Sequence, residues 1–194
     1  MTPELTPAQQ RMLDAYLRHV SAEFETQRVP DAMASMVATP HVMLLPVLDG
    51  GYGREQVAEF YTKRFVFSMP PDMHLELLTR IVAGDHVVEE SVMSFTHTQE
   101  IPWILPGVAP TGRRAEFPVC VVVKLEGDRV AHEHIYWDQA SVLRQLGLLA
   151  PASLPVVGAE AARTLRDPSL LHSQVAERAR GAARAPTKPK GDTQ

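Results

Sequence analysis

Apolar residues in the first part of the chain recur every three or four positions from Leu13 to Phe24, which is the spacing of one helix face. Residues 6–9, just before this stripe, supply a threonine for the N-cap, a proline for the first helical position and a glutamine for the reciprocal cap. The pattern predicts a first helix that ends near Gln27. A second amphipathic pattern predicts another helix over residues 54–67.

Most of the remaining apolar segments are short and bounded by Gly, Pro or charged residues, which is typical of strands. A short helix is expected around residues 31–37, a turn over 48–53, and strands over 41–47, 74–82, 87–100, 114–125 and 130–138. In the first hairpin Val82 should oppose Val87, which pairs Arg80 with Glu89 across the strands. This element order predicts an α+β fold in which a curved antiparallel sheet wraps around the N-terminal helices.

The last predicted strand carries an unusual row of ionisable side chains. With a turn centred on residues 127–128, strict alternation places these polar residues on one face: His132, His134, Tyr136 and Asp138. The same register sets them opposite apolar residues of the preceding strand: Phe117, Val119, Val121 and Val123. Such an apolar wall must either bury the polar groups with hydrogen-bond partners or line a pocket.

Composition fits one domain with a tail. The chain has 194 residues, of which 45% are hydrophobic, and we assign residues 1–149 to the domain, 150–184 to an extension with short docked helices and 185–194 to a disordered tail. The domain is acidic and the tail weakly basic, so nucleic acid is not expected as a partner. With neither a secretion signal nor a long apolar run, we expect a cytoplasmic protein without a membrane span.

Residues 101–112 form a loop that is broken by Pro and Gly but is apolar, and it carries Trp103. We expect it to fold over either the core or the mouth of a ligand pocket. The only cysteine, Cys120, lies in a run of valines, where a small buried hydrophobe is expected rather than a nucleophile.

Asp138 is the leading candidate for a general acid or base, because partial burial raises the pKa of a carboxyl group toward neutral pH. The alternative is that Asp138 caps the helix that begins near Ser141. Tyr136 offers a hydroxyl that can stabilise an enolate oxygen, or it is a core tyrosine. Glu90, on an apolar face of its strand, is either a second acid or base or half of a buried pair.

His132 and His134 point the same way on a strand, and His97 is a conceivable third metal ligand. No carboxylate or thiolate nearby completes a familiar metal pattern, so we expect no metal. A proton-transfer or orienting role is expected for His134, and a structural role for His132.

Five short segments together resemble the SnoaL-like polyketide cyclases of the nuclear transport factor 2-like superfamily. They are residues 96–100 (THTQE), 110–114 (PTGRR), 127–130 (GDRV), 136–138 (YWD) and 143–147 (LRQLG). The resemblance covers roughly residues 8–149 and implies a cone-like pocket in the curved sheet. It departs from the family in the apolar insertion at residues 101–108 and in the second strand-borne histidine.

The resemblance implies a cofactor-independent enzyme for aldol cyclisation or isomerisation of a small apolar carbonyl compound. In this family an aspartate near the end of the last strand acts as acid or base, and Asp138 matches its position. His134 or His97 would assist and Tyr136 would hold the oxyanion. The substrate would contact Glu90, His132, Trp103, Phe117, Val119 and Val121. Because the superfamily serves several functions, two alternatives stay open: a non-catalytic ligand-binding or association module, and an epoxide or ester hydrolase.

A homodimer is expected through the outer face of the sheet. On the register given above, that face consists of Glu133, Ile135 and Trp137 with Pro118, Cys120 and Val122.

Overall fold

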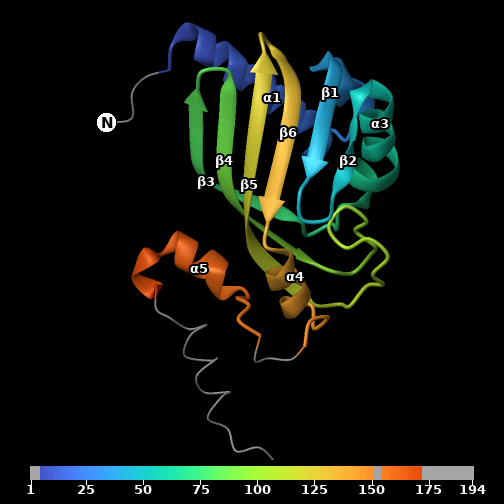
Figure 1. Ribbon diagram of the computed structural model, residues 1–194, viewed down its shortest axis with the longest axis vertical. Coiled ribbons are helices and arrows are strands. Elements are labelled where there is room, and N and C mark those ends of the chain that lie inside the picture. Colours follow the sequence, from blue (N-terminus) through green and yellow to red (C-terminus); the bar gives the residue numbers. More distant parts are fainter. Residues whose placement is uncertain (1–4, 151–153, 172–194) are drawn as a thin grey trace, which may run out of the picture.

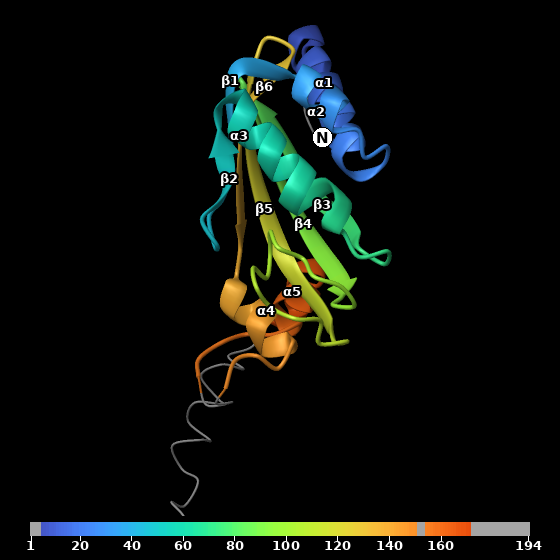
Figure 2. The same ribbon diagram turned by 90° about the vertical axis from the view of Figure 1, so that its right-hand side faces the viewer.

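The computed structural model describes residues 5–150 and 154–171. Three helices lie against one face of a curved, mixed sheet of six strands, and two short helices lie at its lower end (Figures 1 and 2). The helices are α1 (Pro7–Phe24), α2 (Val29–Ala34), α3 (Gly53–Phe60), α4 (Gln139–Gln145) and α5 (Glu160–Arg166). A π-helical turn (Tyr61–Phe65) and a 3-10 turn (Val66–Ser68) extend α3, so the helix predicted over 54–67 is confirmed with a distorted end.

The first helix begins as its sequence predicts. The Thr6 backbone N–H donates to Gln9 Oε1 (2.9 Å), and the Gln9 backbone N–H donates to the Thr6 hydroxyl (3.3 Å). This reciprocal pair satisfies two N–H groups that a helix start leaves without partners. The helix ends at Phe24, three residues earlier than predicted, and Gln27 then takes the left-handed conformation with φ of 52°.

The sheet has the order β2-β1-β6-β5-β4-β3. Its strands are β1 (Met36–Leu44), β2 (Asp49–Tyr52), β3 (His74–Ala83), β4 (His86–Thr96), β5 (Arg114–Glu126) and β6 (Arg129–Trp137). All neighbours are antiparallel except β1 and β6, which are parallel. The prediction of a purely antiparallel sheet is therefore wrong at the β1–β6 pair. The segment 48–53, which is expected to be a turn, contains the short strand β2.

The β3–β4 hairpin has the predicted register. Val82 pairs with Val87, and Arg80 lies opposite Glu89 with 2.5 Å between Arg80 Nε and Glu89 Oε1. The faces are reversed, however, because Glu89 is buried and Glu90 is exposed. The prediction that Glu90 lies on the core face is therefore wrong.

The β5–β6 hairpin differs from its predicted register by one residue. Leu125 pairs with Val130, but Lys124 pairs with His132, so Ala131 is an extra residue on β6. Such a β-bulge reverses the side to which all following side chains point. Glu133 therefore faces the helices and is 5% exposed, whereas His134 faces outward.

The core fills the space between the helices and the concave face of the sheet. The loop after β4 contributes to it through Ile101, Trp103, Ile104 and Leu105, all at most 2% exposed. Trp103 packs edge-on against Phe65, with ring centres 4.9 Å apart. This apolar loop therefore folds over the core, which is one of the two placements that the sequence predicts for it.

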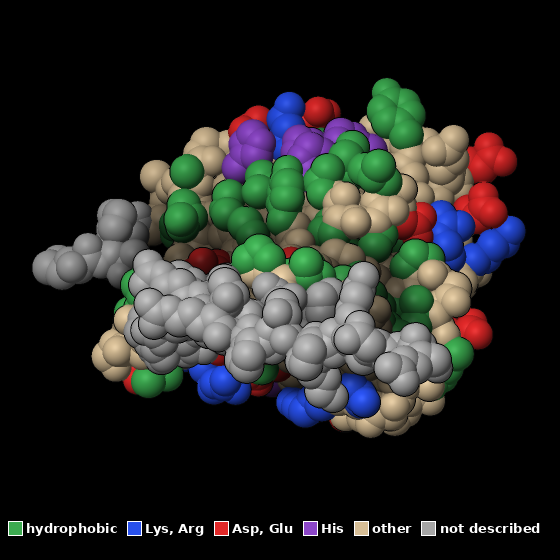
Figure 3. All heavy atoms as spheres, turned by 60° about the horizontal axis from the view of Figure 1, so that its bottom comes forward, with side chains coloured by type: hydrophobic (Ala, Val, Ile, Leu, Met, Phe, Trp, Pro, Cys, Tyr) green, Lys and Arg blue, Asp and Glu red, His purple; other side chains and the backbone are tan. Residues whose placement is uncertain are grey.

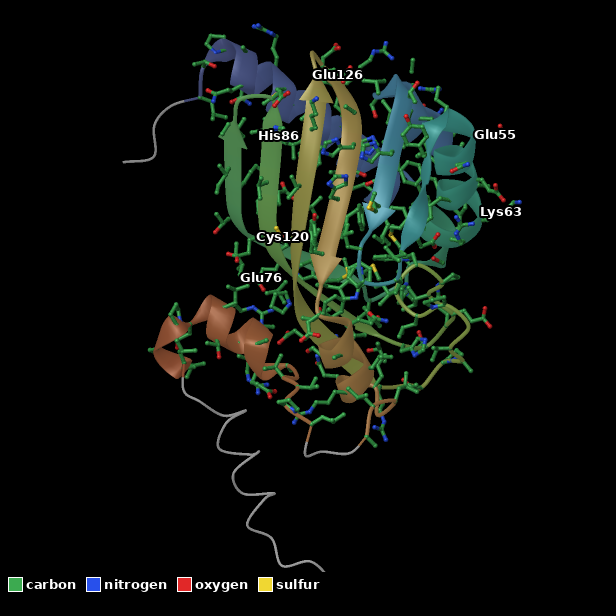
Figure 4. The ribbon with its side chains drawn as sticks, in the orientation of Figure 1. Glu55, Lys63, Glu76, His86, Cys120 and Glu126 are labelled. Carbon is green, nitrogen blue, oxygen red and sulfur yellow. The ribbon has the colours of Figure 1, made fainter. Side chains whose placement is uncertain are left out.

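The helix predicted in the C-terminal extension is confirmed as α5. Arg166 of α5 reaches Glu76 of β3 (2.7 Å) and Glu116 of β5 (3.1 Å), which fixes the helix beside the lower sheet (Figure 4). The part of the predicted extension after residue 171 lies outside the described residues, as does the predicted tail over 185–194. Within residues 5–150 and 154–171, no helix has both the length and the apolar character of a membrane span.

Candidate acid–base site in the interior

A cavity of about 70 Å³ lies between α1, the distorted end of α3 and the concave face of the sheet. Its walls are mostly apolar and include Val20, Phe24, Phe60, Leu75, Met93, Val121 and Ile135. Six further lining residues carry polar groups: Tyr16, Glu23, Tyr61, Glu89, Trp103 and Glu133. An apolar pocket with a few convergent polar groups is the usual form of a small-molecule site.

His19 organises the larger polar group. Its Nε2 lies 3.3 Å from Glu23 Oε1, 3.6 Å from Glu133 Oε2 and 3.2 Å from the Tyr61 hydroxyl. The Tyr61 hydroxyl also donates to Glu133 Oε2 at 3.3 Å. Helix α1 places His19 and Glu23 one turn apart on its inner face, and the bulge in β6 turns Glu133 toward them.

The other ring nitrogen of His19 is held by α2. Nδ1 lies 2.7 Å from the Ser35 hydroxyl oxygen, and that hydroxyl donates its own proton to the carbonyl oxygen of Ala32 (2.7 Å). Nδ1 must therefore carry a proton and donate to Ser35. This contact fixes the ring so that Nε2 faces the carboxylates.

The charges in this group shift its pKa values. Burial alone would lower the pKa of His19, but the carboxylates of Glu23 and Glu133 outweigh it and raise that pKa well above its usual range. Burial, with the charge of Glu133, raises the pKa of Glu23. Burial also raises the pKa of Tyr61 well above its usual value. At neutral pH the group thus holds an imidazolium, a protonated tyrosine and a carboxyl group that takes up a proton more readily than usual.

A second polar group, made by Tyr16 of α1 and Glu89 of β4, lines the same cavity. Glu89 accepts from the Tyr16 hydroxyl (3.1 Å) and pairs with Arg80 (2.5 Å). Burial is the main cause that raises the pKa of Tyr16 well above its usual value, and Glu89 adds to it. Both Glu89 oxygens are therefore engaged.

Two polar atoms of the lining residues have no hydrogen-bond partner among the described residues. They are Glu23 Oε1, whose approach to His19 lacks hydrogen-bond geometry, and Trp103 Nε1. Buried polar atoms are normally satisfied by protein, water or ligand. Because Glu23 and Trp103 both line the cavity, these two atoms are candidate contacts for a ligand there.

The residues that the sequence placed in one pocket-facing row do not face the cavity. His132, His134 and Tyr136 lie on the outer face, because the bulge at Ala131 shifts the register by one. The prediction that they share an apolar wall with Val119 and Val121 is wrong for this reason. Asp138 is exposed and accepts from the Ser141 backbone N–H (3.2 Å), so it caps α4, the other predicted role.

His97 and Glu90 lie apart from both polar groups. His97 is fully buried behind the loop after β4, where Thr111 N–H donates to its Nδ1 (3.3 Å), and burial lowers its pKa. Glu90 is on the outer face opposite Cys120, which is half-buried with a thiol pKa raised mainly by burial.

Some of the predicted ligand contacts do line the cavity: Trp103, Val119 and Val121. Phe117 is fully buried but packs edge-on against Phe95, with ring centres 6.0 Å apart, rather than at the cavity.

Three outward histidines meet instead on the convex side. They are His41 of β1 and His132 and His134 of β6, with His41 Nε2 3.0 Å from His134 Nε2. Burial, followed by the charges of neighbouring residues, chiefly His134, lowers the pKa of His132 to about 4. Of the described residues, two sets bring three metal-ligating atoms together: these three histidines, and His19 with Glu23 and Glu133.

Comparison with protein families gives a match to the SnoaL-like polyketide cyclases over residues 8–146. The chain belongs to this family. Among curated proteins no sequence matches it.

Solved structures that resemble this SnoaL-like protein share its nuclear transport factor 2-like fold. A protein from Jannaschia sp. CCS1 classed as a SnoaL-like polyketide cyclase is 17% identical, with a TM-score of 0.63 over 77% of this chain and 99% of its own. A protein with a ketosteroid isomerase-like fold from Catenulispora acidiphila DSM 44928, in complex with trimethylamine, is 19% identical, with a TM-score of 0.54 over 76% and 100%. A nuclear transport factor 2-like protein of unknown function from Burkholderia pseudomallei K96243 is 16% identical, with a TM-score of 0.52 over 70% of this chain and 97% of its own.

Sequence reasoning missed the interior group of this SnoaL-like protein. His19 and Glu23 are polar residues four apart on the apolar side of the first helix, which is a readable signal. Tyr61 gives no such signal, because its helical spacing is that of any core position, and strict alternation places Glu133 on the outer face.

We predict that stability falls as the pH rises above neutrality. Because the folded pKa of His19 exceeds its unfolded value of about 6.5, its contribution is complete below pH 6.5 and is lost as the pH rises through the folded pKa. One proton changes the free energy of unfolding by ~1.4 kcal/mol per pH unit. Urea unfolding between pH 6 and 9 measures this slope.

Glu23→Gln removes one of the charges that raise the pKa of His19 and should flatten the slope. Glu55→Gln, on the exposed side of α3, is the matched control and should keep it (Figure 4). Equal slopes in the wild type and in Glu23→Gln would contradict the charged state of His19.

Proposed function

We propose that this protein catalyses a cofactor-independent proton transfer on a small, largely apolar carbonyl compound, in an aldol cyclisation or an isomerisation. The observation that carries the proposal is a pair of polar atoms on residues that line an apolar cavity. Neither atom makes a hydrogen bond to the described residues, although Glu23 Oε1 lies 3.3 Å from His19 Nε2. Glu23 Oε1 is an acceptor for a proton, and Trp103 Nε1 is a donor for an oxygen. Formation of an enolate needs an acceptor for the proton and a hydrogen-bond donor for the oxygen.

In this proposal Glu23 removes the proton next to the substrate carbonyl. Its raised pKa brings it closer to the working pH, where a general base is most effective. As Glu23 becomes neutral, it no longer attracts the His19 imidazolium, which stays paired with Glu133 (3.6 Å). Glu133 and Tyr61 therefore act as positioning residues that keep His19 in place.

The negative charge that develops on the substrate oxygen is stabilised by Trp103. Its indole N–H has no acceptor among the residues that the structure describes, and its ring packs against Phe65 and Trp137 at ring-centre distances of 4.9 and 6.5 Å. A donor that is already oriented in a site of low polarity is effective for this purpose.

The sequence-based alternative keeps the proton transfer at Asp138, assisted by His134 or His97 and by Tyr136. It is supported by the family position of Asp138. The first assignment places the proton transfer in the interior cavity, and the second places it at the exposed Asp138. One set of variants therefore separates them.

A non-catalytic ligand-binding role is supported by a different observation, since a solved protein of similar fold holds trimethylamine. Binding alone would need the cavity but not a carboxyl group of raised pKa.

The test is hydrogen–deuterium exchange next to the carbonyl of a probe ketone, cyclohexanone, in D2O, followed by NMR. The wild type should accelerate exchange, and Glu23→Gln should lose about 10²–10⁴-fold, the usual contribution of a general base. Trp103→Phe should lose less and keep the fold.

Asp138→Asn is the matched control and should keep full activity. Loss of activity in Asp138→Asn with full activity in Glu23→Gln would contradict the assignment to the interior and support Asp138. Saturable binding of the ketone without any exchange would support the binding module.

We also propose that the protein forms a homodimer through the outer face of the sheet. The surface given by the sequence is corrected, because Glu133, Ile135 and Trp137 point inward. The outer face instead exposes large apolar side chains without a helix of the described residues over its upper part: Met43, Ile81 and Tyr136 (Figure 2). Exposed apolar patches of this kind mark association surfaces.

Ile81→Glu places a charge on this face, where Ile81 is 53% exposed, and should convert the dimer to a monomer. Leu48→Glu, in the turn between β1 and β2, is the control and should stay dimeric. Sedimentation velocity at ~50 µM distinguishes the two species, well above the Kd of a stable dimer. A monomeric wild type would contradict the proposal.

A further inference from the structure

Three imidazole rings are gathered on the convex face of the sheet, on the side away from the cavity. The rings of His132 and His134 stack with centres 4.3 Å apart, and the ring centre of His41 lies 4.7 Å from that of His132. One nitrogen of each of the three rings lies within 4.8 Å of the others. Figure 3 shows histidine side chains gathered at the surface beside apolar ones.

The fold creates this cluster from distant parts of the chain. Parallel pairing of β1 with β6 sets His41 opposite His132, and His134 follows two residues later on the same face. The bulge at Ala131 is what turns both β6 histidines outward. Two ligands at i and i+2 of one strand and a third on the neighbouring strand are therefore held by the sheet backbone.

The surroundings leave the ring nitrogens available. Within the described residues, the hydrogen bond between His41 and His134 is the only one made by these three side chains. Each ring is half-buried, and Tyr52 stacks on His41 with ring centres 6.1 Å apart. Lys124, whose charge acts on His132, pairs with Asp85 at 3.9 Å.

We propose that His41, His132 and His134 bind one divalent transition-metal ion, with Zn²⁺ as the representative ion. Zinc–imidazole bonds of ~2.0–2.1 Å in a tetrahedral site separate the ligand nitrogens by ~3.3 Å, and His41 and His134 already lie at 3.0 Å. The stacked ring of His132 must rotate about its side-chain torsions, for which its half-exposed position leaves room. A water molecule completes the site.

Ligand chemistry selects the class of metal. Three neutral imidazoles suit Zn²⁺, Co²⁺, Ni²⁺ or Cu²⁺, whereas Mg²⁺ and Ca²⁺ prefer carboxylate and carbonyl oxygens. The site uses side chains of one chain and does not involve the interior cavity. It therefore stands independently of the proposed enzyme activity.

The test is titration of untagged, chelator-treated protein with ZnCl2 by calorimetry, together with the visible spectrum of the Co²⁺ form. One ion per chain should bind, with the intense absorption of a tetrahedral Co²⁺ site. His134→Ala and His41→Ala should each weaken zinc binding by at least the ~10–100-fold that loss of a mere supporting residue costs. His74→Ala, at an exposed position of β3, is the control and should bind as the wild type does.

Two further variants separate this site from the other proposals. Glu23→Gln, which alters the interior set of ligand atoms, should bind zinc with unchanged affinity, and so should the monomeric Ile81→Glu. Zinc binding that survives in His134→Ala, or an equal loss in His74→Ala, would overturn the proposal. Wild-type protein that binds no zinc at about 100 µM would also overturn the proposal.

Discussion

A single extra residue in β6 determines what each face of this sheet can do. Ala131 has no partner on β5, so Val130 and Glu133 both point toward the helices although they are three positions apart. A bulge of this kind costs little backbone energy but exchanges the two faces of the strand beyond it. Without it, His132 and His134 would enter the core and Glu133 would face outward.

The interior accommodates Glu133 because neighbouring side chains neutralise its negative charge and donate a hydrogen bond to it. A carboxylate in an apolar core costs several kcal/mol unless it is paired and hydrogen-bonded. His19 and Tyr61 supply both, and Ser35 fixes the His19 ring from behind. Glu23 is the second carboxyl group beside this one imidazolium, and burial together with the charge of Glu133 raises its pKa.

Local patterns in the sequence predicted what depends on local physics. The capping box at Thr6, the register of Val82 against Val87 and the Arg80–Glu89 pair follow from neighbouring residues, and the structure confirms them. The bulge in β6 could not be predicted from the sequence, because no Gly or Pro near Ala131 marks the position where alternation is interrupted. The parallel partner of β1 could not be read either, since the segments that meet there are about ninety residues apart.

Cysteine cross-linking across β5 and β6 measures the register directly. In a Cys120→Ser background, Val122→Cys with His134→Cys should form a disulfide on mild oxidation, because directly paired residues have Cα atoms ~4.5–5.5 Å apart on one face. Val121→Cys with His134→Cys should stay reduced, since these residues point to opposite faces. Rapid oxidation of the second pair and not the first would contradict the bulge, and with it the placement of Glu133 in the cavity.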